Sequence, residues 1–197
     1  MQALKTEQFG DPDLITRISA LEAEVEAMKE AVLKTGIDPK MNRVSLVVYS
    51  GALDKLLAAM NIATGAASMG CEVHLFFTFW ATSAMRKDEP SGKKSAMEKL
   101  FGMMLPAGID DLKLSTMNMG GIGTAMIKRR MKHKNIADLD KLFKMAEELG
   151  VKISICEMSL DLMGMTMDDL RHYPCMEVCG VGTFMARALE SKVTLFI

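Results

Sequence analysis

Apolar and polar residues alternate along the chain from residue 42 onward in a pattern that predicts short strands and amphipathic helices in turn. Val44–Tyr49 and Glu72–Phe79 are apolar runs of strand length. Between them, Leu53–Met69 places apolar residues at helical spacing and stops at Gly70. A buried strand, a helix and a second buried strand in this order predict a βαβ unit with a right-handed crossover.

The same alternation continues through the rest of the sequence. The further predicted strands are Asp111–Leu114, Val151–Ile155 and Val193–Ile197, and the further predicted helices are Ala96–Leu105, Thr124–Lys132, Leu139–Leu149 and Thr183–Leu189. The polar and charged residues Ser83–Ser95 predict a loop or a lid. Strands that alternate with helices favour a mainly parallel sheet with helices on both faces, which is an α/β fold of three layers.

A separate helix is predicted ahead of this domain, opened by Asp11-Pro12-Asp13 and ended by Gly36. Its apolar residues recur at spacings of four and three over about three heptads, which makes a narrow seam. They are Leu14, Ile18, Leu21, Val25, Met28 and Val32. A partner helix or the helix's own domain would cover such a seam, and we favour self-association. The predicted organisation is a heptad helix over residues 1–38 and an α/β domain over residues 42–197.

Composition and charge narrow the function classes. The formal net charge of −1 and the isoelectric point near 6.3 give no global field that favours nucleic acid or an anionic membrane. The N-terminal residues hold no secretory h-region, and no apolar run is long enough to span a bilayer. Four cysteines in 197 residues do not resemble a disulfide framework. These observations predict a cytoplasmic protein with no integral membrane segment and with thiols mostly reduced.

Methionine is unusually abundant, at 20 of 197 residues. Flexible methionines fill gaps in a core, and they also form adaptable docking surfaces. We expect most of them to pack in the core, and only an exposed cluster would support docking.

Cys156 is the strongest candidate for chemistry. It follows the predicted strand Val151–Ile155 and precedes a helix start at which Ser159 is the expected N-cap. Open α/β sheets place their chemistry at the carboxyl ends of their strands, and the unpaired N–H groups of a helix start favour a thiolate. A buried structural cysteine is the alternative, and the position alone leaves the two interpretations level.

Ser159 stands where a dithiol motif would have its second cysteine. A Cys-x-x-Cys pair closes on itself and exchanges electrons, whereas a Cys-x-x-Ser segment cannot. Such a thiol can hold a covalent adduct, for example a persulfide, and pass it on.

Cys175 and Cys179 are four residues apart, near His172. If helical, the two cysteines would share a face, and with His172 they would offer zinc an incomplete ligand set, so no metal is expected. They could instead act as resolving thiols for an adduct on Cys156. Two unrelated thiols are the remaining alternative.

Gly120, Gly121 and Gly123 precede the basic helix Thr124–Lys132. This loop lacks the spacing of a dinucleotide fingerprint and the lysine of a phosphate loop, so a tight turn is favoured over nucleotide binding. The basic cluster at 128–134 is either a solvated helix face or a docking patch for an acidic carrier or an anion.

Residues 151–164, Val-Lys-Ile-Ser-Ile-Cys-Glu-Met-Ser-Leu-Asp-Leu-Met-Gly, closely resemble the Cys-x-Met-Ser-Met-Asp-x-Met-Gly segment of DsrE/DsrF-like proteins, in the branch often labelled peroxiredoxin family proteins. Supporting segments lie at 76–80, which ends in Trp80, and at 119–124, 180–184 and 193–197. The resemblance covers about residues 42–197 and leaves out the N-terminal helix. No peroxiredoxin active-site motif accompanies it.

The resemblance implies a compact, mainly parallel five-stranded sheet, usually in homo-oligomers, and a persulfide exchanged with a TusA-like carrier or a rhodanese. Only Cys156 matches the reactive position. The leading hypothesis is therefore a sulfurtransferase-like carrier rather than a turnover enzyme, without a cofactor, in which Gly120–Thr124, Trp80 and Met158–Met163 shape the pocket. The alternatives are a non-catalytic oligomeric adaptor and a flavodoxin-like nucleotide-binding domain.

Overall fold

The structure is a computed structural model that describes residues 12–34, 42–87, 105–106 and 108–197, with side chains of the first helix described for residues 16–30. The chain divides into two units, residues 1–40 and 41–197. The predicted helix Ala96–Leu105 and most of the predicted loop Ser83–Ser95 lie outside the described residues.

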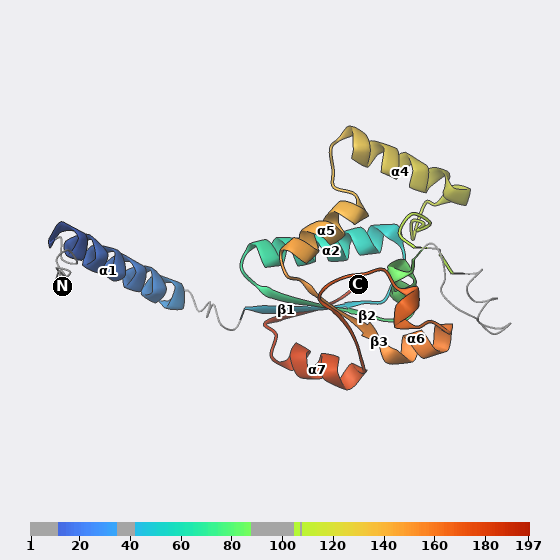
Figure 1. Ribbon diagram of the computed structural model, residues 1–197. Helices are drawn as coiled ribbons and strands as arrows, with labels where there is room; N and C mark the ends of the chain where they lie inside the picture. Colours follow the sequence, from blue (N-terminus) through green and yellow to red (C-terminus); the bar gives the residue numbers. More distant parts are fainter. Residues whose placement is uncertain (1–11, 35–41, 88–104, 107) are drawn as a thin grey trace, which may run out of the picture. The chain divides into compact units, whose positions relative to one another are not determined.

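The second unit is built on a five-stranded sheet in which every pair of neighbouring strands is parallel (Figure 1). The strand order is β4-β3-β2-β1-β5. The strands are β1 (Arg43–Val48), β2 (Glu72–Phe77), β3 (Lys152–Cys156), β4 (Met176–Cys179) and β5 (Val193–Phe196). The expected α/β fold with a mainly parallel sheet is confirmed, and the βαβ unit that opens it is β1, α2 and β2.

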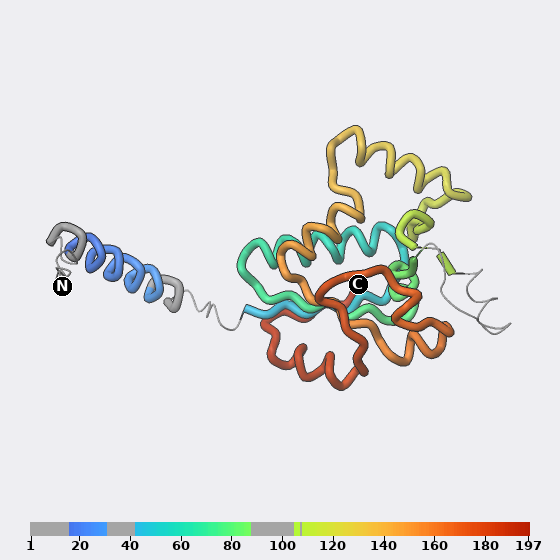
Figure 2. Tube along the Cα trace, viewed as in Figure 1, coloured from blue at the N-terminus to red at the C-terminus, as the bar shows by residue number. Residues whose placement is uncertain are grey.

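Helices cover both faces of the sheet, and they are α2 (Leu53–Ser68), α5 (Leu139–Glu148), α6 (Glu157–Met163) and α7 (Val181–Leu189). In Figures 1 and 2, α2 and α5 lie on one face and α7 lies on the other. The helix α4 (Ile122–His133) stands beside the α2 and α5 layer.

The main core lies between the sheet and the layer of α2 and α5. Alternate strand residues point into it, because successive side chains of a strand face opposite sides. In β3, Ile153 and Ile155 join this core, whereas Cys156 joins a smaller cluster with Phe184 of α7. The sheet therefore separates a large apolar core from the face that carries the candidate thiol.

One predicted strand is wrong. Asp111–Leu114 forms a turn and an irregular segment, and the fifth strand is instead β4. The backbone groups of this segment form hydrogen bonds outside the sheet. The Lys113 carbonyl accepts the N–H of Leu53 at 2.9 Å, and the Leu114 N–H donates to the Thr124 hydroxyl at 3.1 Å. Leu112 is buried. The apolar side chain that suggested a strand therefore holds a loop against the core.

The start of the predicted loop Ser83–Ser95 also differs from the prediction. Ser83 belongs to the 3₁₀ helix η2 (Phe79–Met85) and is buried. Its hydroxyl donates to the Trp80 carbonyl at 2.6 Å. The hydroxyl of Ser83 therefore pairs locally inside the fold, rather than facing water as a loop.

The first unit contains α1 (Pro12–Lys34), close to the predicted helix. The seam residues Ile18, Leu21, Val25 and Met28 are exposed. No helix among the described residues combines the length and the apolar character that a membrane crossing requires.

The expectation that most methionines pack in the core is wrong for the described residues. Four methionines are buried and nine are exposed. The exposed set is Met28, Met69, Met117, Met119, Met126, Met145, Met158, Met167 and Met185. Because long apolar side chains on a surface are available for contact, this distribution turns the methionines into candidate docking residues.

Candidate active site around Cys156

Cys156 lies at the carboxyl end of β3 and is the N-cap of α6, so the strand passes directly into the helix. The expected strand-end thiol is confirmed, but Ser159 as N-cap is wrong. Ser159 is the third residue of α6 and is fully buried, and no side chain caps this helix. The helix begins earlier than predicted because Cys156 itself takes the extended N-cap conformation.

Ser159 instead connects α6 to the end of β2. Its Oγ accepts the backbone N–H of Phe79 at 2.8 Å and lies 3.1 Å from Oγ1 of Thr78. Phe79 has a φ of 47°, in the left-handed region of the backbone that residues other than glycine seldom adopt. The bond from its N–H to a buried hydroxyl holds this turn in place beside the thiol.

The pKa of Cys156 lies below its ordinary value as the balance of opposing effects. Burial is the largest effect and raises the pKa, because a charged sulfur loses its water. Hydrogen bonding by the hydroxyl and the backbone N–H of Ser159, by the Thr78 hydroxyl and by the Met158 N–H together outweighs burial. The site therefore favours the thiolate, which is the nucleophilic form.

An apolar cluster surrounds the thiol on the face covered by α7. Cys156 packs with Phe76 and Phe184, whose rings are stacked with centroids 4.9 Å apart. Val47, Ala188 and Cys179 pack against this cluster. Cys156 is 4% exposed, so an adduct on its sulfur would be shielded from water.

Cys179 is the last residue of β4 and the register partner of Cys156 in the parallel pair β3–β4. Its pKa is raised, chiefly by burial, with Glu177 and Cys156 adding to the shift. The structure therefore brings Cys179 beside Cys156, in a strand that the sequence pattern left undecided.

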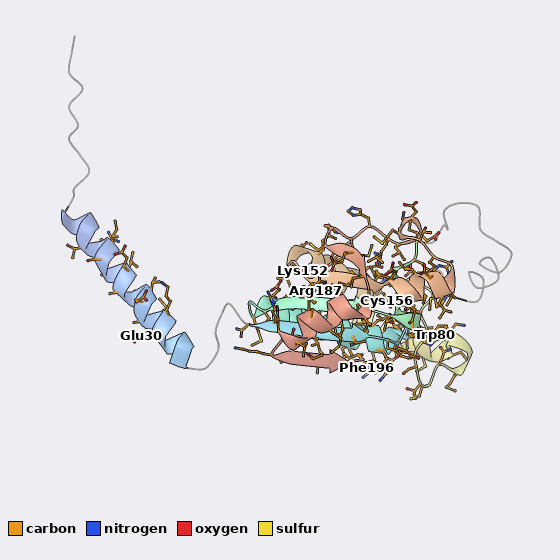
Figure 3. All side chains as sticks on the ribbon, turned by 90° about the horizontal axis from the view of Figure 1, so that it is seen from below. Glu30, Trp80, Lys152, Cys156, Arg187 and Phe196 are labelled. Carbon is orange, nitrogen blue, oxygen red and sulfur yellow. The ribbon has the colours of Figure 1, made fainter. Side chains whose placement is uncertain are left out.

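Cys175 lies at the other end of β4, just before its first residue, and is exposed. It lines a pocket of about 620 Å³ with His74, Lys152 and Arg187. In Figure 3, Lys152 and Arg187 lie toward one end of the sheet and Cys156 and Trp80 toward the other.

The polar network beside Cys175 was not predicted. Glu72 accepts from Lys152 at 2.6 Å, from Arg43 at 2.7 Å and lies 3.2 Å from Nε2 of His74. Nδ1 of His74 is buried without a hydrogen-bond partner among the described residues, so this histidine is only half satisfied. Alternating polar residues at 43, 72, 74 and 152 are the signal in the sequence that could have revealed the network.

Trp80 follows Phe79 in η2 and is half-exposed at 51%. Its carbonyl approaches Gly51 so closely that a Cβ there would lie 2.6 Å from the oxygen. The backbone of Trp80 therefore lies close against Gly51, two residues beyond Thr78, while its side chain is exposed.

The glycine loop forms the tight turn that begins α4. Gly120 and Gly121 have φ values of 69° and 100°, and a Cβ on Gly123 would lie 1.8 Å from the Met117 carbonyl oxygen. The Thr124 hydroxyl donates to Asn118 at 2.8 Å. These contacts join the loop to residues 114–118 rather than to Cys156.

The fold and the site together describe an α/β protein with a cysteine thiol at the end of a strand in a five-stranded parallel sheet. Comparison with known proteins gives the family to which it belongs. Residues 40–196 match the model of the DsrE/DsrF/DrsH-like family. The chain belongs to this family, as the resemblance at residues 151–164 indicated.

Two curated relatives align with this chain over nearly their whole length. An uncharacterized protein named YrkE from Bacillus subtilis is 44% identical over 156 residues, 79% of this chain and 96% of its own. The sulfur carrier protein DsrE2 of Allochromatium vinosum is 30% identical over 162 residues, 80% of this chain and 99% of its own. Among solved structures, the ychN protein from E. coli matches with a TM-score of 0.46 and 11% identity over 80% of this chain and 100% of its own.

Proposed function

We propose that this protein is a sulfur carrier that holds sulfur covalently on Cys156. The observation that carries the proposal is the thiol at the end of β3, whose pKa is lowered because hydrogen bonding from α6 and Thr78 outweighs burial. The 30% identity to a protein named as a sulfur carrier supports it.

The loading step needs only the thiolate and a donor with a sulfane sulfur. The Cys156 sulfur attacks that sulfur, a new S–S bond forms, and the donor's leaving group departs with the bonding electrons. The product is a persulfide, or a thiosulfonate when the donor is a polythionate. Attack on the outer sulfur by an acceptor thiol then regenerates the Cys156 thiolate.

The surroundings of Cys156 suit a carrier more than a turnover enzyme. Ser159 gives the site a hydroxyl donor in place of a local second thiol, so the adduct cannot close within the Cys-x-x-Ser segment. The apolar cluster of Phe76 and Phe184 limits hydrolysis by excluding water. We propose TusA-like carriers or rhodaneses as exchange partners, in the cytoplasm, with the chain in a homo-oligomer.

Intact-mass spectrometry after incubation with tetrathionate or polysulfide tests the proposal. The wild-type protein is expected to gain sulfur, and Cys156→Ser is expected to gain none. Cys71→Ser is the matched control, since Cys71 is half-buried just before β2. Equal sulfur uptake by Cys156→Ser and wild type would sink the carrier function.

A non-catalytic adaptor is the second candidate, because the exposed seam of α1 and the exposed methionines offer contact surface. Alkylation kinetics separate the two functions. In an adaptor, Cys156 would react with iodoacetamide near neutral pH no faster than a model thiol, whereas a carrier thiolate reacts faster.

A further inference from the structure

Cys156 and Cys179 end neighbouring strands at the same level of the sheet. They are register partners in the parallel pair β3–β4. Neighbouring strands lie about 4.7–4.9 Å apart, and register partners point to the same face. A disulfide requires Cα atoms roughly 4.4–6.8 Å apart, so the backbone already meets this condition.

The space around the two thiols also favours a reaction between them. Both pack on the cluster of Phe76 and Phe184, on the face that α7 covers. Cys156 is buried and Cys179 is half-buried. Because the two residues are register partners and share this cluster, Cys179 is the thiol of this chain best placed to reach Cys156.

Cys175 does not share this position. Its carbonyl accepts the N–H of Ile153 at 3.0 Å, which fixes it at the amino end of β4. Cys179 lies four positions further along the chain, which is about 13 Å at roughly 3.3 Å per residue. That separation is about twice the reach of a disulfide.

We propose that Cys179 is the resolving thiol of Cys156 and closes a disulfide between β3 and β4, an inference that rests on the sulfur-carrier function proposed above. The Cys179 thiolate, formed by loss of its proton to solvent, attacks Sγ of the Cys156 persulfide. The bond from this Sγ to the outer sulfur breaks, and the outer sulfur leaves with the electron pair as hydrosulfide. Both cysteine sulfurs are oxidised to the disulfide, while the sulfane sulfur is reduced to sulfide.

The difference between the pKa values of the two thiols favours loading of Cys156 before attack by Cys179. Hydrogen bonding favours the thiolate of Cys156, so this residue takes up sulfur first. Burial, Glu177 and the Cys156 charge disfavour the thiolate of Cys179, while Ser154 and Arg187 favour it. Cys179 therefore stays protonated while a partner has time to collect the sulfur, and it discharges the sulfur that no partner takes. A dithiol reductant restores the empty carrier.

The test follows the Cys156 adduct in the full-length protein after a pulse of inorganic polysulfide. Wild type is expected to gain one sulfur atom, then lose it as sulfide and end two hydrogens lighter, with a peptide that joins Cys156 to Cys179. In Cys179→Ser and Cys179→Ala the one-sulfur adduct should last more than about tenfold longer, since an oriented neighbour reacts far faster than a dissolved thiol. Cys175→Ser, the matched control, should behave as wild type.

Two results would overturn the inference, and they differ from each other. If wild type and both Cys179 variants keep the adduct equally long, resolution by Cys179 is wrong and the carrier function stands. If neither wild type nor the Cys179 variants gain sulfur, the carrier function fails and the resolution step fails with it.

Discussion

At the scale of single residues, the reactivity of Cys156 depends on how well hydroxyl and N–H groups compensate for its burial. Burial alone would hold the thiol protonated, and it is the largest single effect on the pKa of Cys156. Ser159 supplies two of the compensating groups, its hydroxyl and its N–H. Ser159 is itself held by the Phe79 N–H, so the turn after β2 influences the thiol at the end of β3.

Ser159→Ala is expected to lower the reactivity of Cys156 near neutral pH severalfold. The lowered pKa means that wild type forms its thiolate at a lower pH than an ordinary cysteine, so losing the hydroxyl moves the alkylation midpoint to higher pH. A pH series of iodoacetamide rates measures this shift.

The control for that prediction is Thr78→Ser, which keeps a hydroxyl beside Ser159. It should leave the alkylation midpoint close to that of wild type. An unchanged midpoint in Ser159→Ala would show that the hydroxyl does not favour the thiolate. Because the Phe79 N–H loses its partner in that variant, the unfolding free energy should also fall, by about 1–3 kcal/mol.

The sequence was sufficient to find Cys156 but not the groups around it. The strand-to-helix change at residue 156 is local, and local patterns are readable. Thr78 approaches Cys156 from the residue after β2 and Cys179 from the end of β4, and which strands are neighbours is decided by the packing of the whole sheet. The role of Ser159 could not be predicted for a similar reason, because its hydroxyl accepts a hydrogen bond from the N–H of Phe79, which lies 80 residues earlier in the chain.

At the scale of elements, the three central strands and the edge strand β5 were predictable from the sequence, and the other edge strand, β4, was not. β1 and β2 are mostly apolar because central parallel strands are covered on both faces, and β3 alternates polar and apolar residues, which is also a strand pattern. β4 is a half-buried edge strand, Met-Glu-Val-Cys, and its weak pattern does not distinguish it from a loop or a helix. Asp111–Leu114 has a similar pattern, and only its tertiary hydrogen bonds decide against a strand.

The start of α4 depends on Gly123. Gly123→Ala is expected to lower the unfolding free energy by about 1–3 kcal/mol, because the new Cβ collides with the Met117 carbonyl. Urea denaturation measures the change.

Gly65→Ala, in the middle of α2, is the matched control. A Cβ at Gly65 meets nothing within 4 Å, so this variant should be roughly 0.5–1 kcal/mol more stable than wild type. Equal stability of Gly123→Ala and wild type would contradict the collision.

The network around Glu72 joins three strands and should govern part of the stability in acid. Hydrogen bonds from Lys152 and then Arg43 lower the pKa of Glu72 to about 2. A carboxylate with a lowered folded pKa stabilises the fold above its unfolded value, near 4.5, and this contribution is lost as the pH falls toward 2.

Glu72→Gln is therefore expected to be less stable than wild type at pH 6 and to lose less stability between pH 4.5 and pH 2. Thermal unfolding across that range measures both effects. Glu148→Gln, at the exposed end of α5, is the control. Parallel pH profiles for Glu72→Gln and wild type would exclude the network as a source of acid sensitivity.

At the scale of the whole molecule, the chain combines a compact α/β unit with a helix that carries its own exposed seam. The seam was readable because a heptad pattern depends only on spacing along one helix. The exposure of most described methionines was not readable, since composition does not tell which side of an element a residue occupies. Only the finished fold shows that α4 buries little more than Thr124.

Removal of residues 1–38 is expected to lower the oligomeric state or the stability while leaving Cys156 as reactive as before. The first unit, residues 1–40, holds the exposed seam, and the thiol lies in the second. Light scattering and alkylation rates measure the two properties. An unchanged mass on truncation would count against self-association through α1.

The pairing of β1 with β5 sets a waiting time during synthesis. Arg43 of β1 and Glu190, just before β5, form an ion pair across 147 residues of chain. A ribosome that adds roughly 5–20 residues per second needs on the order of ten seconds to cover that stretch. Throughout this time the outer edge of β1 has no strand beside it, and open strand edges recruit other chains. The edge of β1 is therefore open to pairing with other chains until translation delivers β5.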